Sequence, residues 1–255
     1  MIDKSVLTLP QDKSHTSNNI GSGRFGACVQ MVYKDMFLVC AKELTPDVSL
    51  RPSNQKQRLV ALNSCQYIPP CFGVCLARRA IVMSYISIAG KSVNLHTALS
   101  SVIDGLELNA TVYMDVLIQL CQGLQFVHTK GFLHNDLKLD NVVLGHSYSN
   151  TVKPYVVDFG KACTVGDGKC YGLSQEEKKR YKQEHAHIAP DLCDGPVSQS
   201  FLTDIYSFGR IIRKVNRLVI RSNSLAELVK QAMAYHSNVR PTLADIAATL
   251  EGSRI

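Results

Sequence analysis

Residues 134–141 read HNDLKLDN and residues 158–160 read DFG, and these two stretches decide how the whole chain is interpreted. The first carries Asp136 and Asn141 five residues apart, a spacing that lets one tight loop present both side chains to the same cleft. The second carries Asp158, which follows a short β-like run and is expected at a neighbouring strand end. Phosphoryl transfer needs a carboxylate that orients the attacking hydroxyl and accepts its proton, together with oxygen ligands for Mg2+. Asp136 suits the first role, and Asn141 and Asp158 suit the second.

A second constellation lies near the start of the chain, where residues 20–26 read IGSGRFG. Alone, this glycine-rich stretch fits a flexible turn as well as a phosphate-binding loop. The residues that follow favour the second interpretation, because 27–32 and 36–41 read as two β-strands, where a dinucleotide-binding fold would need a helix. Glycines between two strands let backbone N–H groups approach a triphosphate, and Lys42 on the next strand can pair with its oxygens. The loop and Lys42 are therefore predicted to form one site.

These motifs, in this order, resemble the eukaryotic protein kinase family from about residue 20 to residue 250. Residues 39–42 read VCAK where the family favours V-A-x-K, so Lys42 matches the strand lysine. Asp136 matches the catalytic-loop base, and Asp158 matches the metal ligand of the D-F-G motif. Lys138 stands two residues after Asp136, as is typical of serine/threonine kinases. Its ammonium would neutralise charge on the transferring phosphate.

Further matches lie in the second half of the chain. Residues 189–191 read APD where the family has A-P-E, and Arg240 matches the arginine that usually pairs with that acid. Residues 204–209 read DIYSFG and resemble the start of the buried helix whose aspartate, here Asp204, braces the catalytic loop. The ordered set of six matches is specific for the family.

The resemblance implies an α+β, bilobal protein-kinase-like fold, with a small β-rich N-terminal lobe and a larger, mainly helical C-terminal lobe. We expect residues 1–18 to form a loose N-terminal arm. Residues 19–252 are expected to form the kinase domain, with the N-lobe at 19–84, the hinge at 84–90 and the C-lobe at 91–252.

The C-lobe prediction rests on helical periodicity, which is clearest over residues 112–129. Capping-box signatures at Ser224 and Thr242 mark two later helix starts. Residues 158–191 read as irregular. The region after the helix that starts at Asp204 is expected to be shortened, so that a helix commonly used for docking is absent or reduced.

The resemblance also implies the residues of the active site. Asp136, Lys138 and Lys42 would be catalytic, and Asn141 and Asp158 would hold Mg2+. The residues expected to contact ATP comprise the glycine-rich loop, two thiols beside the adenine, the strand lysine, the gatekeeper and the hinge, namely Ile20, Gly21, Ser22, Gly23, Arg24, Phe25, Gly26, Cys28, Cys40, Lys42, Met83, Ser84, Tyr85 and Ile86. Plain core packing explains Cys28 and Cys40 equally well.

The implied function is an ATP- and Mg2+-dependent protein kinase that phosphorylates serine or threonine in protein substrates. Residues 48–103 contain no Asp or Glu, so the helix glutamate that pairs with Lys42 in the family is missing. The aligned position falls within residues 55–57. Asn135 replaces the usual arginine, and Glu184 replaces a threonine, five residues before the APD alanine. These departures leave open a nucleotide-binding pseudokinase that acts as a scaffold or allosteric partner.

Composition narrows the remaining possibilities. The 255 residues are 45% hydrophobic and 19% charged, which excludes a disordered or collagen-like chain. The net charge of +7 comes largely from residues 48–103, but no base-reading motif accompanies it, so no specific nucleic-acid partner is expected. Nine cysteines without a C-x-x-C pair indicate a reducing compartment rather than disulfides or a zinc site. Without a signal-like or membrane-spanning stretch, we expect an intracellular, cytoplasmic protein, with nuclear residence left open.

Overall fold

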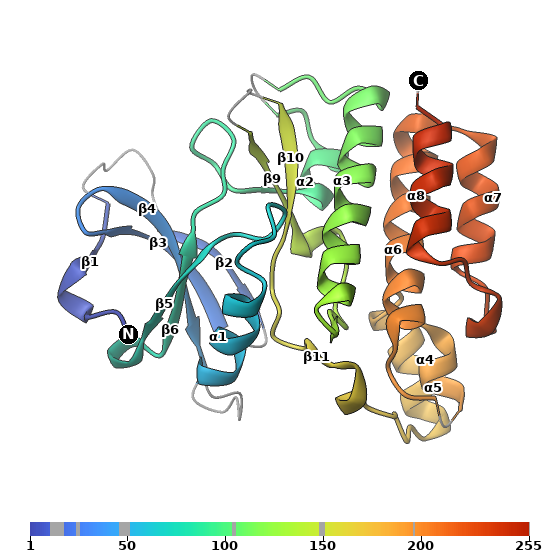
Figure 1. The fold of residues 1–255 in the computed structure, drawn as a ribbon, viewed down its shortest axis with the longest axis horizontal. Coiled ribbons are helices and arrows are strands. Elements are labelled where there is room, and N and C mark those ends of the chain that lie inside the picture. The colour runs from blue at the N-terminus through green and yellow to red at the C-terminus, as the bar shows by residue number, and fades with distance from the viewer. Residues whose placement is uncertain are drawn as a thin grey trace.

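The chain folds into a sheet-rich N-terminal lobe and a helical C-terminal lobe, which lie side by side in Figure 1. The computed structural model describes residues 1–10, 18–23, 26–45, 52–103, 106–147, 151–195 and 197–254, and the side chains of residues 52–56 and Lys182 lie outside this description. The bilobal α+β architecture expected from the sequence is confirmed.

An antiparallel sheet forms the N-terminal lobe, in the order β1-β3-β4-β6-β5 with β2 added to β3. Its strands are β1 (Leu7–Thr8), β2 (Asn19–Gly23), β3 (Gly26–Tyr33), β4 (Phe37–Leu44), β5 (Cys71–Cys75) and β6 (Ala80–Ser84). Helix α1 (Pro52–Ala61) lies against β5. Neighbouring residues of a strand point to opposite faces. In β4, Val39 and Ala41 are fully buried in one apolar cluster, while Lys42 points to the other face.

The first residues of the chain belong to this sheet. The backbone N–H of Ile2 donates to the carbonyl of Val74 at 2.9 Å, and β1 pairs with β3. Ile2 and Leu7 are buried in the apolar cluster on the outer face of the sheet. The expectation of a loose arm is therefore wrong for residues 1–10, because two apolar side chains secure them. Residues 11–17 lie outside the described residues.

The C-terminal lobe is mainly helical. Its helices are α2 (Leu95–Ser100), α3 (Ala110–Thr129), α4 (Gln175–Glu184), α5 (Pro190–Asp194), α6 (Phe201–Val215), α7 (Asn223–Ala232) and α8 (Leu243–Gly252). Its short strands are β7 (Val93–Asn94), β8 (Phe132–Leu133), β9 (Val142–His146), β10 (Val152–Val156) and β11 (Cys163–Thr164). Across the described ranges, no helix has both the length and the apolar content needed to cross a bilayer.

Short single turns complete the described structure. They are the 3-10 turns Lys4–Val6, Leu76–Arg78, Leu139–Asn141, Val165–Asp167 and Ser237–Val239, and the π-helical turn Asn216–Ile220.

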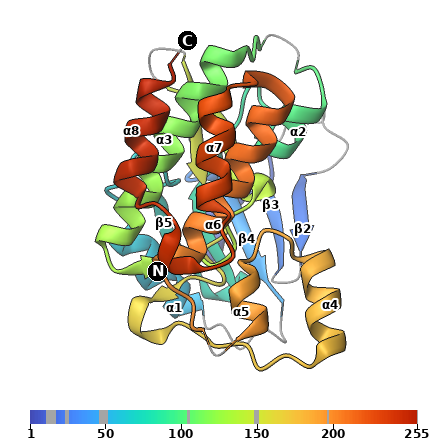
Figure 2. The ribbon, with the colours of Figure 1, turned by 90° about the vertical axis from the view of Figure 1, so that its right-hand side faces the viewer.

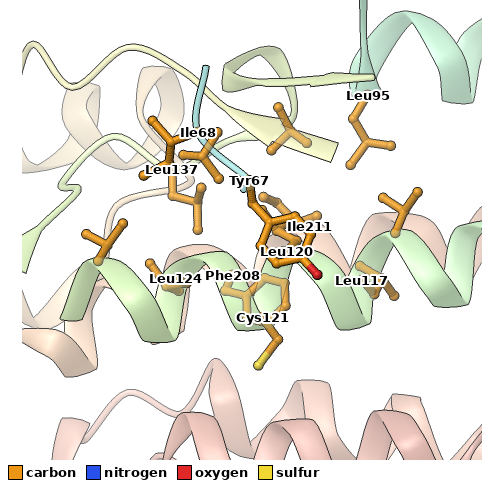
Figure 3. Close-up of a cluster of buried hydrophobic side chains, with 14 of the residues drawn as sticks. Tyr67, Ile68, Leu95, Leu117, Leu120, Cys121, Leu124, Leu137, Phe208 and Ile211 are labelled. Atoms are coloured by element: carbon orange, nitrogen blue, oxygen red, sulfur yellow. The ribbon is translucent and has the colours of Figure 1, made fainter. Parts of the chain in front are cut away.

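The core of the C-terminal lobe is built around α3. Figure 3 shows Leu117, Leu120 and Leu124 of α3 in the same cluster as Phe208 and Ile211 of α6. The three leucines recur at helical spacing, and none is more than 1% exposed. Burial of a side chain of this size contributes about 1.5–3 kcal/mol. The periodicity that predicted this helix therefore corresponds to its buried face.

Short polar side chains fix where the helices begin. The side chain of Asn109 accepts from the first turn of α3 at 3.0 Å, and Thr242 forms the predicted capping box with Asp245. Helix α7 is capped by Ser222 rather than by Ser224, two residues earlier than expected. The π-helical turn at the end of α6 stops at residue 220, so little chain separates α6 from α7. The expected shortening of this region is confirmed.

The segment after the DFG motif is more regular than expected. Residues 175–184 form α4, which lies beside α5 near one end of the lobe (Figure 2). Ser174 begins α4 by accepting from the backbone of Glu177, whose carboxylate accepts from the backbone N–H of Ser174 at 2.8 Å. This capping box was present in the sequence as S-x-x-E and would have predicted the helix.

Candidate active site

A buried carboxylate on α6 holds the loop that follows β8. Asp204 is 1% exposed and accepts hydrogen bonds from the backbone N–H groups of His134 at 2.8 Å and Asn135 at 2.9 Å. The ring of His128 lies 3.0 Å from the same carboxylate. Burial raises the pKa of Asp204, but the hydrogen bond and charge of His128, together with His134, hold it below the usual value. Asp204 therefore braces the loop, as the resemblance implied.

The braced loop requires an unusual backbone at its second residue. Asn135 has a φ of 61°, in the left-handed region that asparagine tolerates better than most residues. Its side-chain amide donates to the carbonyl of Lys161 at 3.2 Å and to the sulfur of Cys163 at 3.1 Å. Asn135 thus joins the catalytic loop to the segment after DFG through neutral contacts, at the position where the family has an arginine.

Asp136 is the most heavily contacted carboxylate of the site and is 5% exposed. Its Oδ1 lies 2.6 Å from Nζ of Lys161 and 3.0 Å from Nε2 of His187. Asn141 donates to Oδ2 at 3.2 Å, and Nζ of Lys138 lies 3.9 Å from Oδ2. Burial raises the pKa of Asp136, but the hydrogen bonds from His187 and Lys161 and the two lysine charges outweigh it and hold the pKa far below the usual range. The carboxylate therefore stays ionised at neutral pH.

Lys161 and His187 were absent from the residues predicted for the site. Lys161 directly follows the DFG motif, and His187 stands two residues before Ala189. Glu184, at the position of the family threonine, is exposed, and the contact to Asp136 comes from His187 three residues later. The sequence shows only that Lys161 lies beside DFG and that His187 lies near APD. It could not predict that both contact Asp136, because those contacts depend on how the segment between the two motifs folds.

Asp158 and Lys42 form an ion pair that joins the two lobes. The residue before Asp158, Val157, donates its N–H to the carbonyl of Asn141 at 2.9 Å, which sets Asp158 beside the catalytic loop. Asp158 has a φ of 63°, and its Oδ1 also accepts from the N–H of Gly160 at 3.2 Å. Lys42 is 7% exposed. Lys42, Asp158 and the loop that carries Asp136 thus meet at one place.

The aromatic residue of the DFG motif secures this arrangement. Phe159 is 4% exposed, and its ring packs edge-on against the ring of His134 at a centroid distance of 4.8 Å. The Nε2 atom of His134 lies 3.1 Å from the carbonyl of Val157. If Phe159 left this position, its apolar ring would be exposed to water and its contact with His134 would be lost. The burial of Phe159 therefore helps to keep the neighbouring Asp158 facing Lys42.

No acidic residue of α1 supports Lys42. Gln57 is exposed, and the side chains of residues 55–56 lie outside the described part of the chain. Glu43, next to Lys42 on the strand, points to the opposite face and pairs with Arg78 at 2.6 Å. In the described part of the chain, Lys42 is paired instead with Asp158.

The oxygen donors of Asn141 and Asp158 fit a magnesium ion. The Nδ2 atom of Asn141 donates to the backbone carbonyl of Asp136 at 2.8 Å, which turns the amide oxygen away from that residue. Asp158 supplies a carboxylate from the adjoining segment. Mg2+ prefers such hard oxygen ligands, and commonly takes one or two protein ligands together with phosphate oxygens and water. The two residues predicted as metal ligands therefore have the right chemistry and lie on neighbouring segments.

The described part of the glycine-rich stretch lies in β2 and at the start of β3. Residues 20–23 belong to β2, and Gly21, Ser22 and Gly23 pair with β3, whereas Arg24 and Phe25 fall outside the described residues. Gly26 has a φ of +142°, and a Cβ there would lie 1.9 Å from the backbone oxygen of Glu43. Only glycine fits at Gly26, because β4 approaches it directly.

The predicted roof of the nucleotide site lies on one face of the sheet. Cys28 on β3 is opposite Lys42 on β4, and Cys40 on β4 is opposite Met83 on β6. Residues directly opposite each other, or two apart on one strand, share a face. The side chains of Cys28, Cys40 and Met83 therefore line the same surface as the Lys42 ammonium.

The hinge follows β6 and is held by backbone hydrogen bonds. The N–H of Ser84 donates to the carbonyl of Pro70 at 2.9 Å, and the N–H of Tyr85 donates to that of Leu38 at 3.3 Å. Ile86 packs over Gly145 of β9, where a Cβ would come within 2.8 Å of its methyl group. The hinge residues therefore contact β4 and the residue before β5 on one side and β9 on the other.

Comparison with known families accounts for this geometry. A model of the protein kinase domain matches residues 14–240. The chain belongs to the protein kinase domain family. It is similar to cysteine-rich receptor-like protein kinase 6 of Oryza sativa subsp. japonica, with 24% identity over 84% of this chain and 31% of the relative.

Two further relatives carry different names. A probable LRR receptor-like serine/threonine-protein kinase of Arabidopsis thaliana is 25% identical over 83% of this chain and 20% of its own length. A tyrosine-protein kinase of Girardia tigrina is 25% identical over 78% of this chain and 38% of its own. The chain spans between 20% and 38% of the length of these three curated relatives.

In this kinase domain, Asp191 stands where the family has the glutamate of the APE motif, and it still forms an ion pair with Arg240. Arg240, whose side chain is 0% exposed, donates to Oδ1 of Asp191 at 2.8 Å. It also donates to the carbonyls of Leu202 and Ala234, each at 2.9 Å, and lies over the ring of Tyr206. The second carboxylate oxygen of Asp191 is buried without a hydrogen-bond partner in the described structure. Aspartate therefore replaces glutamate here with one oxygen left unsatisfied.

Proposed function

We propose that the chain is an ATP- and Mg2+-dependent protein kinase that transfers the γ-phosphate to serine or threonine hydroxyls of protein substrates. The observation that carries the proposal is the meeting of Lys42, Asp136, Asn141 and Asp158 in one site, with the ion pair from Lys42 to Asp158 formed. A chain relieved of catalysis need not retain all four groups. Lys138, beside Asp136, supports serine/threonine specificity through the resemblance.

The residues would divide the work by charge and position. Asp158 and Asn141 would hold Mg2+, which neutralises phosphate charge when bound. Lys42 would pair with phosphate oxygens under the glycine-rich turn, and Lys138 would stabilise charge that develops during transfer. Asp136 would orient the substrate hydroxyl and accept its proton. Because Lys161 and His187 bind Oδ1, we assign this role to Oδ2.

The test is incorporation of labelled γ-phosphate from Mg-ATP into mixed protein substrates. Asp136→Asn should lower turnover by about 10²- to 10⁴-fold, the usual contribution of a general base. The matched control is Asp140→Asn, which removes an exposed carboxylate from the same loop and should leave turnover unchanged. Equal turnover in the wild-type chain and Asp136→Asn would overturn the assignment.

Specificity is read from the same reaction by phosphoamino-acid analysis. We expect phosphoserine and phosphothreonine. Since one relative is named a tyrosine-protein kinase, phosphotyrosine as the sole product would replace the serine/threonine assignment while leaving the kinase assignment intact.

The second candidate function is a nucleotide-binding pseudokinase. It is favoured by one specific observation, namely that Lys161 and His187 already occupy Oδ1 of the catalytic carboxylate. This alternative predicts no phosphate transfer, together with a rise in melting temperature on addition of Mg-ATP, because a ligand that binds only the folded state stabilises it.

A further inference from the structure

Two cysteine thiols lie together on the roof of the predicted nucleotide site. Cys28 is directly opposite Lys42 in the β3–β4 register, and Cys40 is two residues before Lys42 on β4. Both thiols therefore face the side of the sheet that carries the Lys42 ammonium. Both residues are half-buried, so neither is sealed inside the core.

The two thiols shift each other's pKa in opposite directions. Hydrogen bonding with Cys40 lowers the pKa of Cys28; burial opposes this shift, the positive charge of Lys42 adds to it, and the charge of Asp158 opposes it. Hydrogen bonding with Cys28 and burial raise the pKa of Cys40. Of the two thiols, Cys28 is therefore the one that ionises more readily.

The other described cysteines provide a contrast. Burial raises the pKa of Cys65 and Cys121, so these thiols are poor nucleophiles. Cys170 is exposed, and the residue opposite it in an isolated β-bridge is Ser198 rather than a cysteine. Reactive cysteines are typically partly exposed and lie beside a positive charge. Cys28 is half-buried and lies opposite Lys42.

We propose that Cys28 and Cys40 are an oxidisable thiol pair, and that a peroxide converts them into a disulfide that blocks the nucleotide site. The effect on nucleotide rests on the proposed function, because it requires that ATP bind beneath this face of the sheet. The formation of the bond does not.

The chemistry takes two balanced steps. The Cys28 thiolate attacks one peroxide oxygen and forms a sulfenic acid, while the other oxygen leaves as water or an alcohol after taking a proton. The Cys40 thiol then displaces the sulfenic oxygen, which leaves as water, and the disulfide forms. The two thiols together lose two electrons to the peroxide. A dithiol reductant returns both electrons and restores the thiols.

The position of the pair explains why this bond would act on nucleotide. Cys28 and Cys40 are diagonal neighbours on adjacent strands, and such residues lie about 7–8 Å apart between α-carbons. A disulfide usually spans less than about 7 Å, so its formation must draw β3 and β4 together at this point. Lys42 is two residues from Cys40 and would be displaced from Asp158 and from phosphate. The bond would also fill the space expected beside the adenine.

The first experiment maps the bond in the full chain. The reduced protein is treated with hydrogen peroxide, its remaining thiols are alkylated, and the peptides are analysed by mass spectrometry without reduction. We expect a peptide pair that joins Cys28 to Cys40, lost in Cys28→Ser and in Cys40→Ser and retained in Cys170→Ser. Full alkylation of both residues after peroxide treatment, while Cys170 is oxidised, would overturn the proposal.

The second experiment measures Mg-ATP affinity of each protein before and after peroxide, so that each variant is its own reference. In the wild-type chain, we expect oxidation to weaken affinity by about 10- to 100-fold, the worth of one charge-assisted hydrogen bond, and a dithiol to reverse the loss. In Cys40→Ser, affinity should change little on the same treatment. A mapped disulfide that leaves wild-type affinity unchanged would overturn the blocking role.

The two outcomes separate this proposal from the function proposed above. If the reduced chain transfers no phosphate and binds no Mg-ATP, the proposed function fails, and peptide mapping alone still decides whether the thiol pair exists. If the reduced chain is an active kinase and the peptide pair never forms, the thiol pair fails alone.

Discussion

Replacing Asp204 with asparagine tests how firmly the catalytic loop is held. The carboxylate accepts from the backbone N–H groups of His134 and Asn135 and lies within hydrogen-bond distance of His128. Asparagine keeps one acceptor oxygen but turns an amide N–H group toward donors. Breaking a buried charged pair by changing one partner costs about 3–5 kcal/mol. For a chain of this size, the loss corresponds to a decrease in melting temperature of about 6–20 °C.

Asp115→Asn is the matched control for this measurement. Asp115 pairs with Arg254 at 3.1 Å, but the two side chains are 46% and 56% exposed. An exposed ion pair contributes about 1 kcal/mol or less to the free energy of unfolding. The melting temperature of Asp115→Asn should therefore be close to that of the wild-type chain. Thermal unfolding of the three proteins decides the matter. If Asp204→Asn melts together with Asp115→Asn, the brace does not carry the stability assigned to it.

The pH dependence of stability gives a second measurement on the same variants. The folded-state pKa of Asp204 is lowered, so its stabilisation is present above the ordinary aspartate pKa of about 4 and is lost as pH falls through the folded value. Asp204→Asn should therefore lose less stability than the wild-type chain on acidification. An equally steep loss in both proteins would contradict the sign of the shift.

Three further predictions concern separate parts of the molecule. Gly26→Ala should lower the yield of soluble, folded protein, because the new Cβ would lie 1.9 Å from a backbone oxygen of β4. A normal yield with a native circular-dichroism spectrum would contradict this. Arg240→Met should lower the free energy of unfolding by about 3–5 kcal/mol in urea titrations by leaving Asp191 buried and unpaired, and a loss below 1 kcal/mol would refute the buried pair. Lys161→Met should raise the pKa of Asp136, because it removes a hydrogen bond and a positive charge that lower this pKa. The acid side of the pH–rate profile should therefore move to higher pH. An unmoved profile would exclude the contact between Lys161 and Asp136 in solution.

The parts of the fold that sequence could predict are those set by local pattern. The leucines of α3 recur with helical spacing, and β4 buries Val39 and Ala41 with the half-buried Cys40 between them. The loop from Asp136 to Asn141 is likewise local, because five residues of one turn hold both side chains. Asp158 lies next to them because its preceding residue pairs with the same turn.

The parts that sequence could not predict depend on contacts between distant segments. The pairing of β1 with β3 follows from burial of Ile2 and Leu7 against a face of the sheet that exists only after folding. His187 meets Asp136 across 51 positions of the chain, and no local pattern specifies that distance. Helix α4 could have been predicted in part. The sequence contains the capping box at Ser174, but the helix is so polar that no apolar periodicity marks its length.

The strand formed by the first residues covers an edge of the sheet. Strand β4 pairs with β3 along its whole length, from Gly26 to Tyr33, and so occupies one edge of β3. On the other edge, β2 pairs with β3 as far as Val29, and β1 pairs with Val32 and Tyr33. Without residues 7–8, the backbone groups at that end of β3 would be left as an open strand edge, which is a template for pairing with another chain. The N-terminal residues would thus protect the sheet from self-association, although they lie far from the reacting atoms.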